Sequence, residues 1–320
     1  MTLVSSVDSL QSPRFSGIKT FMRLQYSSVT QGFDFAVIGV PFDTGSTYRV
    51  GARFGPQAIR ALSSILRPHN IGHDVSIFDH CSGVDCGDLP VNPGYIEDSY
   101  QRIEQALSPL LCDGVIPILM GGDHSITLPE LRAITKKTGP VALVQFDSHL
   151  DTGDEYFGHR YNHGTVFRRA VEEGLILVDR SVQVGIRGSV YSKDDIKASR
   201  MLGLEVLTAI ECREMGLNNV TRRINERVGD AKVFVTFDID FVDPAYAPGT
   251  GTIEAGGFTS WETLQLVRGL DGMNFVGFDL VEVLPAYDPT EITALLGATV
   301  MFEFISLLAL KKKREDVASL

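Results

Sequence analysis

Seven short runs of apolar residues recur along the chain, and a turn and a longer helix-like stretch follow each one. The runs are Phe35–Val40, Val115–Met120, Val141–Phe146, Val182–Ile186, Leu204–Leu207, Lys232–Ile239 and Phe275–Val281. Most are apolar at successive positions, which is typical of strands covered on both faces. The alternation of strand and helix therefore predicts an α/β fold of three layers, with helices on both faces of a central, mainly parallel sheet.

No sequence feature divides the chain: it has no internal repeat, no low-complexity block and no linker rich in proline and serine. A single α/β domain often exceeds ~150 residues. We therefore expect one domain over residues 1–320, with an N-terminal extension at 1–30 and a C-terminal tail at 311–320. Two of the expected helices lie near Gly55–Arg67 and Leu128–Lys137.

The charge balance argues against a nucleic-acid partner. The chain has 29 Lys and Arg against 40 Asp and Glu, a net charge of −11, whereas a nucleic-acid surface needs clustered cations. We interpret the one basic run, Lys311–Arg314, as a solvated end after a helix, where cations are favoured. We find no apolar stretch that approaches the ~20 residues of a membrane helix, so we expect no membrane span.

Several features favour a cytoplasmic protein. The first residues lack the charged segment and apolar core of a secretory signal. The four cysteines show no C-x-x-C spacing, so in a chain of this length we interpret them as reduced thiols. We interpret His69, His73 and His80 as surface or turn histidines.

Clusters of carboxylates and imidazoles follow three of the predicted strands, where sites form in parallel sheets. The clusters are Gly121–Ser125 (GGDHS), Asp147–Asp151 (DSHLD) and Asp238–Asp240 (DID). Alternate residues of an extended segment point the same way, so Asp147, His149 and Asp151 can face one point. Each cluster alone is common as a helix cap, a salt bridge or a turn. Three of them at strand ends indicate a metal site.

Together the clusters supply four carboxylates and two imidazoles, from Asp147, Asp151, Asp238, Asp240, His124 and His149. Four crowded carboxylates would repel one another strongly without cations. This donor set suits Mn²⁺, and also Zn²⁺ or Ni²⁺, whereas the lack of cysteine disfavours softer metals. The set has the right size for two ions roughly 3.5–4 Å apart.

These residues resemble the ureohydrolase family, which comprises arginase, agmatinase and the guanidino-acid hydrolases. The matching blocks are Gly39–Arg60, Gly121–Ser125, Phe146–Thr152, Asn162–Ala170, Phe237–Gly257 and Asp279–Pro289. They span about Arg14 to Leu308. The resemblance implies an arginase/deacetylase-like fold, hydrolysis of a guanidine to urea and a homo-oligomer, commonly a hexamer. The metal-dependent deacetylases that share the fold resemble this sequence far less.

By the same resemblance, one metal ion is held by His124, Asp147, Asp151 and Asp238. The other is held by His149, Asp147, Asp238 and Asp240, so that Asp147 and Asp238 bridge. Two departures stand out: Ser148 where the family usually has alanine, and Ile253 where it has proline. We expect Ser148 to point away from the metals by strand alternation, with little effect.

Two further residues fit guanidine hydrolysis. Glu282 follows the last predicted strand and can accept paired hydrogen bonds from a guanidinium, although alone it would be an ordinary strand-end salt bridge. His163, in an NHG turn, can shuttle protons near neutral pH, although such a histidine can also simply cap a helix. We place His163, Glu282 and Asp151 in the catalytic set. Two ions sharing one water would supply the nucleophile by lowering its pKa.

The loop between Asp151 and His163 is where the tail of the substrate should lie. Tyr156, His159, Arg160 and Asn162 can receive a carboxylate, whereas Asp154 and Glu155 can receive an amine. The residues alone leave a guanidino acid and agmatine open. Resemblance to the bacterial guanidinopropionase and guanidinobutyrase branch favours 3-guanidinopropionate, then 4-guanidinobutanoate, then agmatine. Two alternatives remain: hydrolysis of a guanidine with little or no tail, with Ni²⁺ as the metal, and a non-catalytic subunit of a mixed oligomer.

Overall fold

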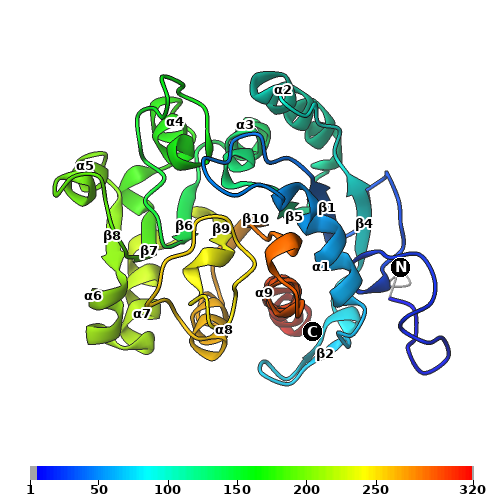
Figure 1. The fold of residues 1–320 in the computed structure, drawn as a ribbon. Helices are drawn as coiled ribbons and strands as arrows, with labels where there is room; N and C mark the ends of the chain where they lie inside the picture. Colours follow the sequence, from blue (N-terminus) through cyan, green and yellow to red (C-terminus); the bar gives the residue numbers. More distant parts are fainter. Residues whose placement is uncertain (1–5, 319–320) are drawn as a thin grey trace.

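A parallel sheet of eight strands forms the centre of the molecule. The computed structural model describes residues 6–318, and its sheet has the strand order β4-β1-β5-β10-β9-β6-β7-β8, with every neighbouring pair parallel (Figure 1). The strands are β1 (Phe35–Val40), β4 (Gly83–Asp88), β5 (Ile116–Gly121), β6 (Ala142–Phe146), β7 (Val182–Ile186), β8 (Glu205–Thr208), β9 (Lys232–Asp238) and β10 (Asn274–Val281). A short hairpin, β2 (His69–Asn70) with β3 (Val75–Ser76), lies outside this sheet.

All seven predicted runs are strands, with bounds within one residue of those expected. The sequence pattern missed the edge strand β4, whose residues GVDCGD include two aspartates and two glycines. Asp85 of β4 is fully buried and accepts bonds at 2.9 and 3.0 Å from the Arg60 guanidinium. An ion pair therefore takes the place of an apolar residue at this edge.

Helices cover both faces of the sheet, as predicted. On one face lie α2 (Ile96–Leu107), α3 (Thr127–Thr138) and α4 (Val166–Glu172), and on the other lie α1 (Gly55–Ser63), α6 (Ala209–Met215), α7 (Leu217–Val228), α8 (Ser260–Arg268) and α9 (Ile292–Ala318). The short helix α5 (Asp195–Met201) packs beside β8. Two clusters of buried apolar residues fill the two interfaces, and together with the sheet they make the predicted three-layer α/β fold.

Helix α9 corrects the expectation that no apolar segment is long enough to cross a membrane. It has 27 residues, and one 18-residue window reaches a mean hydropathy of 2.0. However, 83% of that window is buried inside the fold, because α9 packs between α1 and α8 under the sheet. A helix that is apolar all round is expected in the core of a protein of this size.

The basic run belongs to a helix and is not a tail that follows one, although its side chains are partly exposed to solvent, as expected. Lys311–Arg314 lies within α9, where Lys312 forms an ion pair with Asp34 at 3.0 Å and Arg314 a bidentate pair with Asp271 at 2.8 Å. His73 lies in the turn between β2 and β3, in agreement with the expected surface or turn position, and its side chain is 10% exposed and 3.2 Å from Glu303 of α9.

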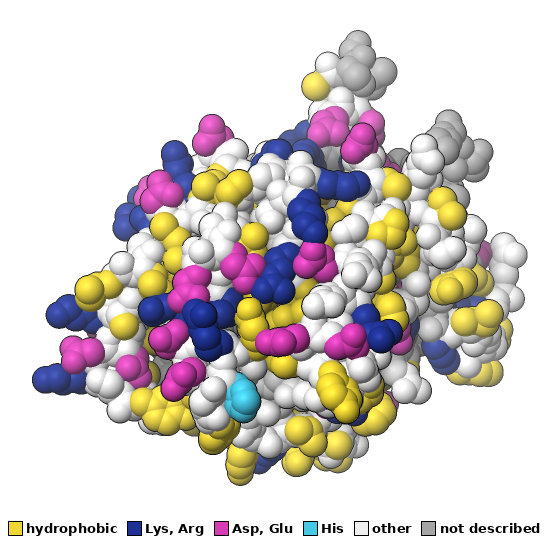
Figure 2. All heavy atoms as spheres, turned by 90° about the horizontal axis from the view of Figure 1, so that it is seen from above, with side chains coloured by type: hydrophobic (Ala, Val, Ile, Leu, Met, Phe, Trp, Pro, Cys, Tyr) yellow, Lys and Arg dark blue, Asp and Glu magenta, His cyan; other side chains and the backbone are white. Residues whose placement is uncertain are grey.

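The segment before residue 30 contributes to the core. Its turn at Phe21–Arg23 is buried, and Phe21, Met22 and Leu24 pack into the cluster on the α9 face. On the opposite face, Figure 2 shows cationic and anionic side chains intermingled over the helices. Pairs such as Arg132 with Glu173 and Lys136 with Glu104 account for this mixture.

Candidate metal centre and active site

Four adjacent strands in the middle of the sheet deliver the candidate residues to one edge. These strands are neighbours in the sheet in the order β5-β10-β9-β6. Their last residues are Gly121, Val281, Asp238 and Phe146, respectively. The turn after β5 needs glycine, because a Cβ at Gly122 would lie 1.9 Å from the carbonyl oxygen of Phe42. The predicted clusters therefore meet where parallel strands end.

The first group of side chains surrounds His124, which is fully buried. Its Nδ1 lies 3.1 Å from Asp147 Oδ2, 3.0 Å from Asp151 Oδ2 and 3.2 Å from Asp238 Oδ2. Its other ring nitrogen lies 2.8 Å from the hydroxyl of Thr236, which orients the ring. His124, Asp147 and Asp151 have the spacing at which one metal ion can be held.

The second group surrounds His149. Its Nδ1 lies 2.9 Å from Asp240 Oδ2 and 3.6 Å from Asp147 Oδ1. Asp147, His149 and Asp240 also have the spacing of a metal site. Asp147 thus faces the first group with one oxygen and the second group with the other.

The electrostatics of these groups fit divalent cations. Burial raises the pKa of Asp238 well above its ordinary range, and the charges of Asp240 and Asp147 raise it further. Burial and Asp147 also raise the pKa of Asp151. His124 Nδ1 and Asp240 Oδ2 are buried, and although each has a polar neighbour within 3.2 Å, neither makes a hydrogen bond of regular geometry among the described residues. A divalent cation at this place would offset the repulsion between the carboxylates and would give these ligand atoms a partner.

His163 and Glu282 form a hydrogen-bonded pair next to the first group. His163 Nδ1 lies 2.9 Å from Glu282 Oε1, which also accepts the backbone N–H of His124 at 3.0 Å. On the other side of the ring, the N–H of Thr47 donates to Nε2 at 3.1 Å. Burial lowers the pKa of His163, but the bond to Glu282 and its charge outweigh burial and raise the pKa to about 9.

Two residues of the site adopt the left-handed backbone region that non-glycine residues avoid. Asp151 has φ 51° and Glu282 has φ 63°. Such conformations cost on the order of 1–3 kcal/mol and persist where the surrounding structure enforces them, often at functional sites. The φ of Glu282 places its carboxylate between His124 and His163, with Oε2 buried and unpartnered among the described residues.

Three of the residues expected at the substrate tail, Arg160, Asn162 and Tyr156, differ in their surroundings. Arg160 is 59% exposed and pairs with Glu172 at 2.6 Å. Asn162 caps the turn at His163–Thr165 by accepting the N–H of Gly164. Tyr156 lies close to Gly153, the residue after next from Asp151: a Cβ at Gly153 would lie 2.8 Å from its ring, and burial and the charge of Asp151 raise its pKa to about 12.

The expectation that Ser148 points away from the clusters was wrong. Its hydroxyl donates to Asp240 Oδ1 at 2.8 Å and lies 3.0 Å from His149 Nδ1. The strand β6 ends at Phe146, so the alternation of side chains does not continue through residues 147–151.

Sequence reasoning also missed a row of buried amides. Gln145 of β6 donates to Asp147 Oδ2 at 2.7 Å and accepts a bond from Gln183 of β7 at 2.6 Å. Gln183 in turn accepts the hydroxyl of Ser199 at 2.6 Å. The two glutamines are fully buried. In the sequence they are polar residues within otherwise apolar runs, and this exception to the pattern could have indicated a buried hydrogen-bond network.

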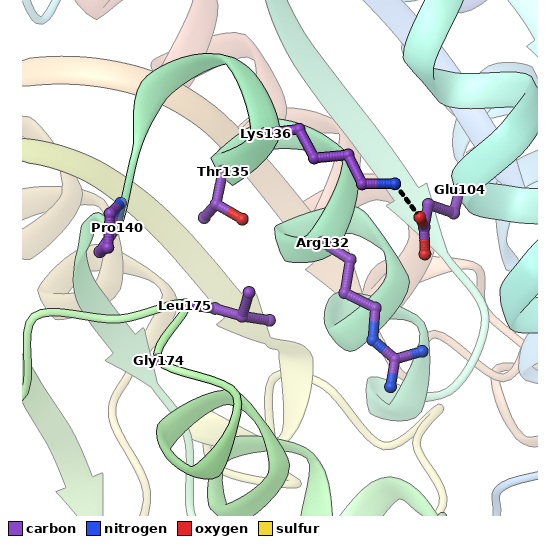
Figure 3. Close-up of a pocket in the computed structure, with 7 residues that line it drawn as sticks. All are labelled: Glu104, Arg132, Thr135, Lys136, Pro140, Gly174 and Leu175. Atoms are coloured by element: carbon purple, nitrogen blue, oxygen red, sulfur yellow. Dashed lines mark hydrogen bonds and ion pairs between the residues drawn. The ribbon is translucent and has the colours of Figure 1, made fainter.

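A hollow of about 400 Å³ on the α2–α4 side is remote from these residues. Figure 3 shows its lining, in which Lys136 of α3 reaches Glu104 of α2. The second cation in the lining, Arg132, is paired with Glu173. Both charges are therefore already neutralised, and we assign no function to this hollow.

Comparison with known proteins identifies relatives over almost the whole chain. The model of the arginase family matches residues 33–306. A guanidinopropionase of Pseudomonas aeruginosa is 47% identical over 95% of both chains, and a guanidinobutyrase of the same organism is 45% identical over 92% of this chain and 94% of its own. The solved proclavaminate amidino hydrolase of Streptomyces clavuligerus is 42% identical, with a TM-score of 0.89 over 93% of this chain and 99% of that one. The chain belongs to the arginase family, whose members are hydrolases that act on guanidino compounds.

Proposed function

We propose that the chain hydrolyses a guanidino acid to urea and an amino acid at a centre of two divalent metal ions. The observation that carries this proposal is the pair of three-residue groups that share Asp147, next to the unpartnered carboxylate oxygen of Glu282. The dependence of the arginase family on two metal ions supports it.

The residues that would hold the ions fall into two sets. We assign His124, Asp147, Asp151 and Asp238 to one ion and His149, Asp147, Asp238 and Asp240 to the other. The donors are nitrogen and oxygen without thiolate, which favours Mn²⁺, with Ni²⁺ as the alternative. When bound, the ions supply the chemistry that a guanidinium needs, a water acidified enough to attack at neutral pH.

Glu282 is the proposed guanidinium anchor. Its Oε1 is held by the His124 N–H and by His163, so the carboxylate cannot turn freely. Its Oε2 is buried and can accept the N–H groups of a guanidinium. The anchor would thus hold the cationic group beside the two carboxylate clusters.

His163 is the proposed proton carrier. Its Nδ1 lies 2.9 Å from Glu282 Oε1, and its Nε2 lies 2.7 Å from the Thr47 hydroxyl, which can accept a hydrogen bond from the charged ring. A pKa of about 9 leaves the ring largely protonated at neutral pH, so it can pass a proton to the departing amine. Asp151, whose charge helps to raise this pKa, completes the proposed catalytic set.

We propose 3-guanidinopropionate as the substrate, with β-alanine and urea as products. The support is the guanidinopropionase and guanidinobutyrase among the relatives, and the position of Tyr156 next to Asp151. Of the three tail residues, only Tyr156 is kept as a substrate contact, because the side chains of Arg160 and Asn162 are engaged elsewhere. We further propose a cytoplasmic homo-oligomer, a hexamer by family resemblance.

A panel of guanidines tests the substrate. The purified chain, loaded with Mn²⁺ or with Ni²⁺, is assayed for urea release from 3-guanidinopropionate, 4-guanidinobutanoate, agmatine, arginine and guanidine. We expect the highest kcat/KM for 3-guanidinopropionate with Mn²⁺. A clear preference for agmatine would overturn the guanidino-acid assignment, and no urea from any compound would favour a non-catalytic subunit.

A substitution at a proposed metal ligand tests the two-ion centre. Asp240→Ala should abolish turnover, and Asp230→Ala, at an exposed position, is its control.

A further inference from the structure

The loop after β6 contains a hydroxyl that touches two residues of the second group. Ser148 is fully buried, and its Oγ lies 2.8 Å from Asp240 Oδ1 and 3.0 Å from His149 Nδ1. The backbone N–H of Ser148 also donates to Asp240 Oδ1, at 3.0 Å. Two donors from a single residue therefore converge on one oxygen of Asp240.

This convergence leaves the other oxygen of Asp240 aimed at the cluster. Asp240 Oδ2 is buried and lies 2.9 Å from His149 Nδ1, but it accepts no hydrogen bond of regular geometry from the described residues. A carboxylate anchored through one oxygen can rotate little, so its free oxygen keeps a fixed direction. Outer partners of this kind orient metal ligands and strengthen metal binding.

We propose that Ser148 is a positioning residue that strengthens binding of the ion on the His149 side by holding Asp240. The inference rests on the proposed two-ion function. An alanine at this position would keep the N–H donor and lose the hydroxyl. This chain would therefore hold its second ion more tightly than its alanine variant does, whereas the ion beside His124 would be unaffected.

Calorimetric titration of the metal-free protein with Mn²⁺, together with metal analysis after equilibrium dialysis, tests this inference without an activity assay. We expect wild type to bind two ions. Ser148→Ala should bind one ion with unchanged affinity and the other with about 10-fold lower affinity, which is the lower end of the effect of losing an outer partner. Ser148→Thr retains the hydroxyl and should restore the second affinity.

Ser181→Ala is the matched control. Ser181 is also fully buried, and its hydroxyl bonds to the backbone at Leu177 O and Leu143 N, away from the metal groups. This variant should bind both ions like wild type. Two results would overturn the role of Ser148 and leave the two-ion function standing. One is an equal affinity for the second ion in wild type and Ser148→Ala, and the other is a loss of that affinity in Ser148→Thr as large as in Ser148→Ala. Fewer than two ions in wild type would overturn the two-ion function as well.

Discussion

At the scale of single residues, the site depends on buried charges that each have a defined partner. Glu282 is the clearest case, because one oxygen is fixed by His124 and His163 and the other is free. Its position after the last predicted strand made it predictable from the sequence. Its left-handed backbone, with φ 63°, was not predictable, because glutamate has no preference for that conformation.

Glu282→Gln keeps the shape of the side chain and removes its charge. We expect kcat/KM to fall roughly 100-fold, because the guanidinium loses a charge-assisted pair of hydrogen bonds. The bound metal content should stay at the wild-type value, because Glu282 belongs to neither metal group. Steady-state kinetics measures kcat/KM, and metal analysis measures the bound metal. The control is Glu173→Gln, a substitution at a remote and partly exposed position. A matching loss of metal would show that Glu282 supports the ions instead of anchoring the substrate.

His163 should make the stability of the metal-free protein depend on pH. Its folded pKa of about 9 lies above the ordinary 6.5, so the stabilisation is complete below pH 6.5 and is lost as the pH rises through 9. Denaturant unfolding should show His163→Gln destabilised by about 2–3 kcal/mol at pH 6. The difference from wild type should shrink by pH 10. A difference that is independent of pH would contradict the raised pKa.

At the scale of elements, apolar runs were sufficient to predict seven strands, because both faces of this sheet are covered. The edge strand β4 was not predictable, since Asp85 is compensated by Arg60, which lies far from it in the sequence. The contact of Ser148 was missed for a different reason. Strand alternation holds only as far as the strand extends, and β6 ends two residues before Ser148.

Helix α9 contains a buried carboxylate with several partners. Glu303 is 1% exposed, accepts a bond from Arg268 at 2.6 Å and lies 3.2 Å from His73. Glu303→Gln would leave the Arg268 guanidinium without its counter-charge. We expect a loss of about 2–3 kcal/mol in the free energy of unfolding, less than for a fully buried pair because Arg268 is 26% exposed. Denaturant unfolding measures it, with wild-type metal content as the control.

At the scale of the whole molecule, the net charge of −11 includes four carboxylates gathered at one edge of the sheet. Removing metal should therefore lower Tm. Free Mn²⁺ at 100 times its Kd stabilises the folded state by about 2.7 kcal/mol per site. Calorimetry with and without a chelator measures the shift, and Asp240→Ala should show a smaller shift than wild type. An identical Tm in both conditions would argue that no ion binds.

Urea release during a Mn²⁺ titration of the metal-free chain tests the central claim most directly. The substrate is the guanidine that performs best in the panel. The two-metal account predicts negligible urea release without metal and a rise to a plateau at two ions per chain. Full activity of the metal-free chain, or a plateau at one ion per chain, would contradict it.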